Sequence, residues 1–177
     1  MTHSPFPSAA PDFSDPLGLL RACHGRIVAH CQTLERLVPH LSAHGADGEA
    51  REAMARVHRY FSTAAQHHHA DEEQDLFPRL ATAAPDLAPL VQALATEHEG
   101  LARHWQALAP LLSAPERAVA DLAAFAAVIG SFVAAYRAHA AKENEQLLPR
   151  AADVLSPEEL RELGARMAAR RGVAAPT

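Results

Sequence analysis

The sequence predicts an all-α protein: a helical bundle of four long helices, preceded by an extended N-terminal arm and followed by a short fifth helix. Apolar residues recur at alternating steps of three and four along most of the chain, which is the period of a helix with one buried face. Alanine and leucine are abundant while β-branched residues are scarce, which favours helix over strand. Prolines and short polar stretches separate the periodic segments from one another.

The composition limits the kinds of partner that the protein can have. A chain of 177 residues, 49% hydrophobic and 21% charged, is long enough for one domain with a sizeable core. A formal net charge of −5 and a pI near 6.2 provide no general attraction to nucleic acid or to an anionic membrane. We therefore expect neither nucleic acid nor a membrane as a partner.

The cysteines and the apolar stretches indicate a cytoplasmic protein. Cys23 and Cys31 would lie about 12 Å apart on one helix, which is too far for a disulfide. The N-terminal residues have neither the basic start nor the apolar run of a signal peptide. The least charged stretch, residues 122–136, has 15 residues and is shorter than the roughly 20 that span a bilayer.

The first helix follows a proline-rich arm. Residues 1–16 contain four prolines and little periodicity, so we expect an extended arm that ends where Pro16 opens the helix. Its seam consists of Leu17, Leu20, His24, Ile27, Cys31, Leu34, Val38 and Leu41. Pro39 is expected to bend or end this helix, and residues 42–48 are expected to form a loop.

The second and third helices are separated by the sequence AAPD. The second is predicted from about Glu49 to Ala81, with Pro78 kinking it near its end. The third spans residues 87–112, and His98 is in phase with its apolar residues.

Two capping boxes predict the starts of the last two helices. Residues 113–116 (SAPE) open the fourth helix, whose seam includes His139 and Glu143. Residues 156–159 (SPEE) open the short fifth helix, which has apolar residues on one face. We favour packing of this face across the bundle, with a contact between copies in a homo-oligomer as the alternative. The expected division is an arm at 1–16, a bundle at 17–152, and a C-terminal helix and tail at 153–177.

Residues 66–80 bring three histidines and four acids into one short segment. If the segment is helical, residues four apart share a face, so His68 with Glu72 or His69 with Glu73 could reach one ion. His68 lies roughly 20° from the preceding apolar stripe, whereas His69 is about 80° away. We therefore expect the first pair to face the core. Such a pair calls for a cation, because burying an unpaired carboxylate is very costly.

The other polar residues near this segment are expected to have less specific roles. His67, His69, Asp71 and Glu73 are predicted at a solvated edge, with a supporting or spare-ligand role for His69 or Glu73 as the alternative. Tyr136, one turn before the histidine of the fourth helix, is predicted in the core, with a hydrogen bond from its hydroxyl to a metal ligand or a bound oxygen species as the alternative.

Two halves of the chain share one pattern. The fourteen residues that begin at His24 align without gaps on those that begin at His98, with five identities. His68 and His139 are each followed by a glutamate four residues on and a proline ten residues on. The intervals between the paired histidines are also alike, 44 and 41 residues. A helical hairpin therefore occurs twice, and each copy supplies one lone histidine and one His-x-x-x-Glu pair.

This repetition predicts a metal site inside the bundle. The candidate ligands are His24, His68, Glu72, His98, His139 and Glu143. Four imidazoles and two bridging carboxylates suit two cations, with two histidines on each. Nitrogen and oxygen ligands without thiolate suit iron, manganese, zinc or copper. We expect two iron ions bridged by the glutamates and by an oxo or hydroxo group, with zinc or manganese as alternatives. Open coordination positions would admit dioxygen, another diatomic molecule or peroxide.

Across roughly residues 17–150 the chain resembles the hemerythrin-like, HHE cation-binding family. The resemblance rests on the two His-x-x-x-Glu motifs with trailing LFP and LLP, and on the lone histidines in DPLGLLRACHGRI and TEHEGLARHW. It implies an up-down four-helix bundle with a non-haem di-iron centre, and the ligands of the family fall on the six candidates above.

Two departures from oxygen-carrying hemerythrins matter. Those proteins have another histidine four residues after the one on the third helix, where this chain has Ala102. They also place the last carboxylate five residues after the fourth-helix histidine, where this chain has Asn144. The sequence therefore favours a symmetric site of four histidines and two glutamates over reversible oxygen carriage.

The predicted function is a non-haem di-iron protein that binds or senses dioxygen or a related small molecule, or handles iron. The alternatives are a di-iron oxidoreductase, acting as an oxidase or as a peroxide or nitric oxide reductase, and a metal-responsive regulator of a partner protein. The Glu-x-x-His motifs of ferritin-like bundles and the His-Glu-x-x-His motif of metalloproteases are absent. Enzymatic activity stays open, and no catalytic residue is assigned.

Overall fold

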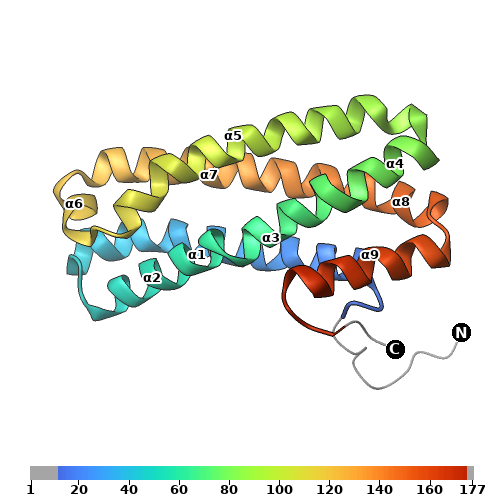
Figure 1. The fold of residues 1–177 in the computed structure, drawn as a ribbon. Coiled ribbons are helices and arrows are strands. Elements are labelled where there is room, and N and C mark those ends of the chain that lie inside the picture. The colour runs from blue at the N-terminus through green and yellow to red at the C-terminus, as the bar shows by residue number, and fades with distance from the viewer. Residues whose placement is uncertain (1–11, 175–177) are drawn as a thin grey trace, which may run out of the picture.

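The computed structural model describes residues 12–174, which form helices joined by short turns, with no strand in that range. The predicted all-α helical bundle is thereby confirmed. Long helical segments run back and forth along one axis (Figure 1). They are α1 (Pro16–His44); the run of α2 (Gly48–Ser62), α3 (Ala64–Asp71), η1 (Glu72–Leu76) and α4 (Phe77–Ala83); α5 (Ala88–Leu112); and the run of α7 (Leu122–Lys142), η3 (Glu143–Leu147) and α8 (Leu148–Val154).

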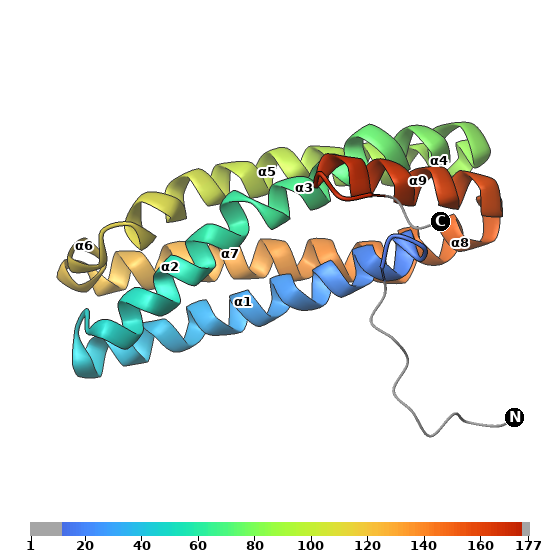
Figure 2. The same ribbon diagram turned by 60° about the horizontal axis from the view of Figure 1, so that its bottom comes forward.

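These segments enclose a common interior. Helix α7 packs against both α1 and α5, and α2 packs against the same two helices. The short elements η2 (Pro85–Leu87) and α6 (Pro115–Ala120) connect the long segments at opposite ends of the bundle (Figure 1). Helix α9 (Pro157–Arg170) returns along the outside, where it contacts α1 and α3 (Figure 2).

Helix α1 begins where the sequence predicts, because Asp15 caps it by accepting a hydrogen bond from the Gly18 amide at 2.9 Å. Most of the predicted arm, residues 1–11, lies outside the described residues. Of the two effects expected at Pro39, a bend or an end, the structure excludes the end, because the helix continues to His44 and the loop before α2 is shorter than the predicted 42–48. Gly45 ends the helix with a φ of 68°, which a glycine adopts without strain.

The predicted second helix is not continuous. Helix α2 ends at Ser62, Thr63 leaves the helical region with φ −131° and ψ −79°, and α3 begins at Ala64. The hydroxyl of Thr63 donates to the Arg59 carbonyl at 2.7 Å, a local bond that competes with the helix ladder.

Each His-x-x-x-Glu motif runs into a π-helical turn, η1 or η3. The amide of Phe77 bonds to the Glu72 carbonyl, and that of Leu148 bonds to the Glu143 carbonyl, in both cases five residues back. A proline follows each of these amides and cannot donate a bond of its own, so the ladder is already interrupted there. The kink expected at Pro78 is therefore preceded by a widened turn, which occurs in both halves of the chain.

One of the two predicted capping boxes forms. At Ser156, the hydroxyl accepts from the Glu159 amide at 3.3 Å while the Glu159 carboxylate accepts from the Ser156 amide at 2.8 Å. The box predicted at Ser113 is wrong. Its hydroxyl donates back to the Ala109 carbonyl at 3.2 Å and so belongs to the end of α5. The fourth helix instead restarts at α7, capped by Asp121.

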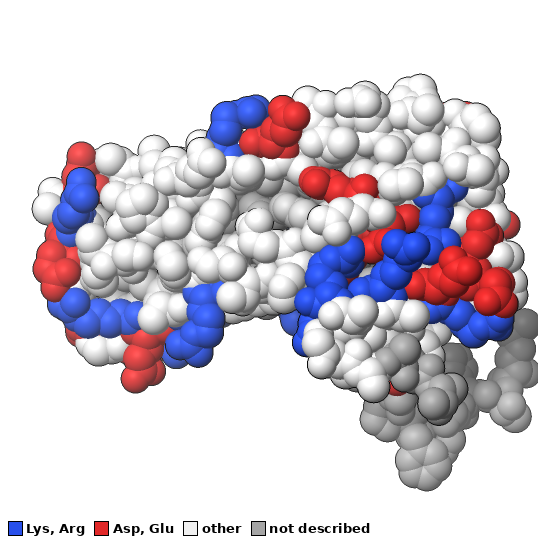
Figure 3. Space-filling view, viewed as in Figure 1, with Lys and Arg blue, Asp and Glu red and all other residues white. Residues whose placement is uncertain are grey.

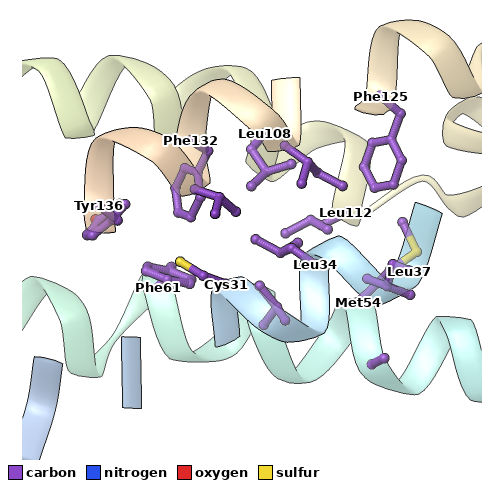
Figure 4. Close-up of a cluster of buried hydrophobic side chains, with 14 of the residues drawn as sticks. Cys31, Leu34, Leu37, Met54, Phe61, Leu108, Leu112, Phe125, Phe132 and Tyr136 are labelled. Atoms are coloured by element: carbon purple, nitrogen blue, oxygen red, sulfur yellow. The ribbon is translucent and has the colours of Figure 1, made fainter. Parts of the chain in front are cut away.

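Two apolar clusters fill the interior, one toward each end of the bundle. The large cluster holds residues of α1, α2, α5 and α7, which Figure 4 shows pointing toward one another from facing helices, with Phe61, Phe132 and Tyr136 among them. The second cluster includes Leu20, Leu76, Leu94 and Leu147, and α9 contributes to it. On every long segment the candidate ligands lie between residues of the two clusters. We refer to the six candidate ligands, His24, His68, Glu72, His98, His139 and Glu143, as the His/Glu layer.

Within the described residues, the helical stretch Leu122–Val154 is long and apolar enough to cross a membrane by length and composition alone, which is weak evidence. It exceeds the 15-residue stretch considered from the sequence. A core helix passes the same test, and α7 buries Phe125, Ile129 and Phe132 in the large cluster.

Candidate metal centre

Every member of the His/Glu layer is buried, with 0–4% of its surface exposed. The four histidines come from α1, α3, α5 and α7, and the two glutamates are the first residues of η1 and η3. The helical phase that selected these six positions therefore places all of them on inward faces. Groups that are distant in the sequence meet in one region of the bundle interior.

The first group of donors contains His24 and His68 with both glutamates, Glu72 and Glu143. Nε2 of His24 lies 3.0 Å from Oε2 of Glu143 and 3.7 Å from Oε1 of Glu72. Nε2 of His68 lies 3.4 Å from that same Oε1 atom. One ligand atom from each of the four residues lies within 4.8 Å of the others, which is close enough to surround one ion.

The second group contains His98 and His139 with the same two glutamates. The two Nε2 atoms lie 3.0 Å apart, so both rings point at one place. Nε2 of His98 is 3.5 Å from Oε2 of Glu72, and Nε2 of His139 is 3.3 Å from Oε2 of Glu143. Glu72 thus turns one oxygen toward each pair of histidines, and Glu143 lies between the same two pairs.

Three of the four histidines are oriented by acceptors on other helices. Nδ1 of His24 lies 2.8 Å from Asn144, that of His98 lies 2.7 Å from Glu73, and that of His139 lies 2.9 Å from Glu97. An acceptor at Nδ1 assigns the ring proton to that nitrogen and leaves the lone pair of Nε2 available for a metal. The support is therefore of the kind that metal-binding histidines have.

Burial and mutual proximity shift the pKa values of the carboxyl groups in opposite directions. Burial raises the pKa of Glu72 to about 8, and the neighbouring charge of Glu143 adds to this increase. Burial opposes ionisation of Glu143 too, but its contacts with His139 and His24 outweigh burial and hold its pKa well below the ordinary value. The neighbouring histidines therefore stabilise the ionised form of Glu143, while Glu72 favours its protonated form.

The pKa values of His24 and His68 are also shifted in opposite directions. Burial opposes the charged form of His24, but Glu143 and Glu72 outweigh it and raise its pKa to about 10. Burial, together with the charge of His24, lowers the pKa of His68 well below its ordinary value. One imidazole next to the carboxylates thus favours a proton while its neighbour favours the neutral form. A divalent cation would satisfy all of these groups at once.

The unsatisfied polar atoms test whether a metal fits. Within residues 12–174, eight buried side-chain nitrogen and oxygen atoms have no hydrogen-bond partner, and all of them lie at this site. They are Nε2 of His24, both ring nitrogens of His68, Nε2 of His69 and the four carboxylate oxygens of Glu72 and Glu143. Buried polar groups are otherwise nearly always paired. Imidazole nitrogens and carboxylate oxygens suit iron, manganese or zinc, so the donor set fits a metal.

His69 was predicted at a solvated edge, with a spare-ligand or supporting role as the alternative; it is partly buried and lies beside the candidate ligands. Its ring stacks on that of His98 with centroids 4.1 Å apart, and it forms a third group of donors with His98 and His139. Burial, followed by the charges of these two histidines, lowers the pKa of His69 to about 3. Glu73, also predicted at the edge, is half-exposed but supports His98, which is the role that the sequence offered as its alternative.

Asp71 is buried, in contrast to the prediction, and its partners come from the end of α9. Arg170 pairs with Asp71, and Arg171 lies 2.7 Å from its other carboxylate oxygen. Arg170 also lies 2.6 Å from Asp75 in η1. Figure 3 shows basic and acidic side chains intermixed over this part of the molecule. The C-terminal helix is thus fastened by ion pairs to the segment that carries Glu72.

Comparison with known proteins agrees with this geometry. The chain is similar to an uncharacterized protein of Haemophilus influenzae, with 33% identity over 164 residues that cover 91% of this chain and 92% of the relative. Residues 15–151, which include the whole His/Glu layer, match the family model of the hemerythrin HHE cation binding domain. The chain therefore belongs to the hemerythrin HHE cation-binding domain family.

Proposed function

We propose that this chain is a non-haem di-iron protein that binds or senses dioxygen or a related small molecule, or handles iron. The observation that carries the proposal is the buried His/Glu layer, in which two groups of donors share two carboxylates. The proposed metal ligands are His24, His68, Glu72, His98, His139 and Glu143. In this proposal residues 17–152 are the cation-binding domain, and the cytoplasmic location predicted from the sequence stays a prediction.

The residues divide the work between the two positions. His24 and His68 would hold one cation, His98 and His139 would hold the other, and the two glutamates would contact both. Bound iron ions supply Lewis acidity and one-electron redox chemistry. The apolar clusters on either side of the layer would exclude bulk water and allow only small molecules to reach the cations.

The test is metal analysis of the full chain, purified aerobically from cells supplied with iron. We expect two iron ions per chain and near-ultraviolet charge-transfer absorption from the di-iron centre, and we expect His68→Ala to lose this absorption and to bind fewer than two iron ions. His104→Ala is the matched control, because His104 lies outside the three donor groups and should leave iron content unchanged. A colourless wild-type protein that loads no iron would contradict the proposal.

Addition of azide, nitric oxide or dioxygen then separates binding from turnover. A binding protein or sensor should show a saturable spectral change that reverses when the small molecule is removed. Continuous consumption of dioxygen, peroxide or nitric oxide would instead support the di-iron oxidoreductase.

One observation favours the regulator as a second candidate. Arg170 at the end of α9 pairs with Asp71 in α3 and with Asp75 in η1, two acids that lie on either side of Glu72 in the sequence. A shift of Glu72 on metal binding would therefore be expected to change the contacts of α9. Hydrogen exchange in the amides of α9, compared with and without iron, tests this candidate. Equal exchange in the two states would argue against it.

A further inference from the structure

The two halves of the site match in their ligands and differ in the residues that support them. Glu73 and Asn144 occupy equivalent places, each directly after a ligand glutamate. Each accepts a hydrogen bond from the lone histidine of the other hairpin: His98 bonds to Glu73, and His24 bonds to Asn144. A carboxylate therefore supports one histidine where a neutral amide supports its counterpart.

A second matched pair differs in the same direction. Glu97 directly precedes His98 and supports His139 through Nδ1 at 2.9 Å. The equivalent residue before His24 is Cys23, which offers no carboxylate. Correspondingly, Nδ1 of His68 has no hydrogen-bond partner within the described part of the chain.

The third difference is an additional donor. His69 follows His68 directly, and the equivalent residue after His139 is Ala140. The ring of His69 lies against His98, and one of its ring nitrogens is within reach of donor nitrogens of His98 and His139. Its Nε2 is buried without a hydrogen-bond partner in the described residues. All three differences between the repeats therefore favour the same pair of histidines.

We propose that the two cation positions are inequivalent, and that the His98–His139 position binds its cation more tightly than the His24–His68 position. This inference rests on the proposed function. A carboxylate at Nδ1 makes an imidazole a more basic ligand and fixes its orientation, and loss of such a partner typically lowers metal affinity ~10–100-fold. Two carboxylates support the His98–His139 position, while one amide supports the other. His69 adds a nearby nitrogen to the tighter position only.

Glu73 gives the clearest test of the effect of a supporting carboxylate. Glu97 also pairs with Lys142, which offsets part of its charge, whereas the contact of Glu73 is to His98. The matched control is Glu99→Gln, because Glu99 is exposed and lines the same surface groove as Glu73. Both substitutions remove one negative charge from that surface, but only Glu73→Gln removes the support of a ligand.

The experiment is a titration of the metal-free full chain with zinc, in competition with a chromophoric chelator. We expect wild type to bind two zinc ions in steps at least ~10-fold apart. Glu73→Gln should weaken the tight step ~10-fold and leave the weak step unchanged, while Glu99→Gln changes neither. A general loss of structure would weaken both steps, so the selective effect distinguishes support of one ligand from a merely structural role.

Ligand variants assign the steps to positions. His139→Ala should remove the tight step, and His68→Ala should retain it. His69→Ala should weaken the tight step, with His67→Ala as the control, because His67 is outside the donor groups.

Two equal steps in wild type, loss of the tight step in His68→Ala, or equal behaviour of the Glu73 and Glu99 variants would overturn the inference. Wild-type protein that binds fewer than two zinc ions would instead count against the proposed function itself.

Discussion

The large apolar cluster and the His/Glu layer are both buried, but the first consists of apolar side chains and the second of polar and ionisable ones. Side chains of the cluster such as Phe61 and Phe132 are fully buried and contact one another edge to face, with centroids 4.9 Å apart. The layer buries imidazoles and carboxylates, and seven of the eight buried side-chain polar atoms without a partner in the described residues belong to it, the eighth being Nε2 of the adjacent His69. The cluster thus stabilises the fold by itself, whereas the layer is costly until a cation occupies it. Apolar packing and the candidate metal ligands are therefore separated along the axis of the bundle.

The largest expected effect breaks the layer without touching the cluster. Glu72→Gln should abolish binding of both cations, because the two oxygens of Glu72 face different pairs of histidines. At metal concentrations ~1,000 times the dissociation constant, each bound cation adds about 4 kcal/mol, or roughly 8 kcal/mol for two independent sites. Denaturant unfolding with and without iron measures this increment, which should vanish in the variant. Persistence of a metal-dependent increment would contradict the bridging role.

A substitution in the large apolar cluster should lower the free energy of unfolding without changing the part of it that depends on metal. Phe61→Ala removes a fully buried ring that contacts Trp105, Phe132 and Tyr136, and should destabilise the protein by about 3–5 kcal/mol. The loss should be the same with and without metal, since Phe61 belongs to none of the donor groups. Parallel denaturation curves of the two forms check this. A loss confined to the metal-bound form would show that the two regions are coupled.

The ion pairs of α9 contact the segment that carries Glu72 from the outside of the bundle, so they test whether the His/Glu layer depends on α9. Arg170→Ala leaves Asp71 and Asp75 with fewer partners and should cost about 1–3 kcal/mol. Arg161→Ala is the control, because Arg161 and its partner Glu158 are each 67% exposed and should contribute little. Thermal unfolding of the metal-free proteins provides the measurement. Equal stability of the two variants would mean that the buried aspartates need no support from α9.

The smallest effect concerns the capping boxes. Ser156→Ala should cost about 1 kcal/mol, because its hydroxyl caps α9. Ser113→Ala should change stability little, because its hydroxyl caps no helix and bonds back to the Ala109 carbonyl. Chemical denaturation of the two variants side by side distinguishes them, and a larger cost at Ser113 would contradict the assignment.

The fold class and the positions of the six buried residues were predictable from one physical regularity. Helical phase places a residue on a known face as long as the helix is regular, and His68, at roughly 20° from its stripe, obeyed that rule. The repeat then distinguished these histidines from the others, because the same spacing occurs in both hairpins. Their role as metal ligands stays a prediction that metal analysis tests.

What periodicity missed has different causes. His69 was predicted at an edge because it lies about 80° off the apolar stripe; it is partly buried, but its ring stacks on that of His98, a contact with another helix that phase alone does not reveal. The support of His139 by Glu97 crosses between α7 and α5, and phase within one helix carries no information about such contacts. The burial of Asp71 likewise depends on Arg170, which is 99 residues away in the chain.

The two π-helical turns, η1 and η3, allow the chain to gain or lose one residue beside the candidate ligands. Each turn contains one residue more than a regular α-helix would use there. Deleting one residue behind a glutamate, such as Gln74, could restore an unbroken ladder while leaving every ligand in the sequence. Because the deletion removes the one extra residue of the wide turn, the helix that follows would keep its orientation, and Leu80 would stay in the interior. Among relatives, a single-residue gap at this point would therefore mark the loss of the wide turn, with the inward faces on both sides of it unchanged.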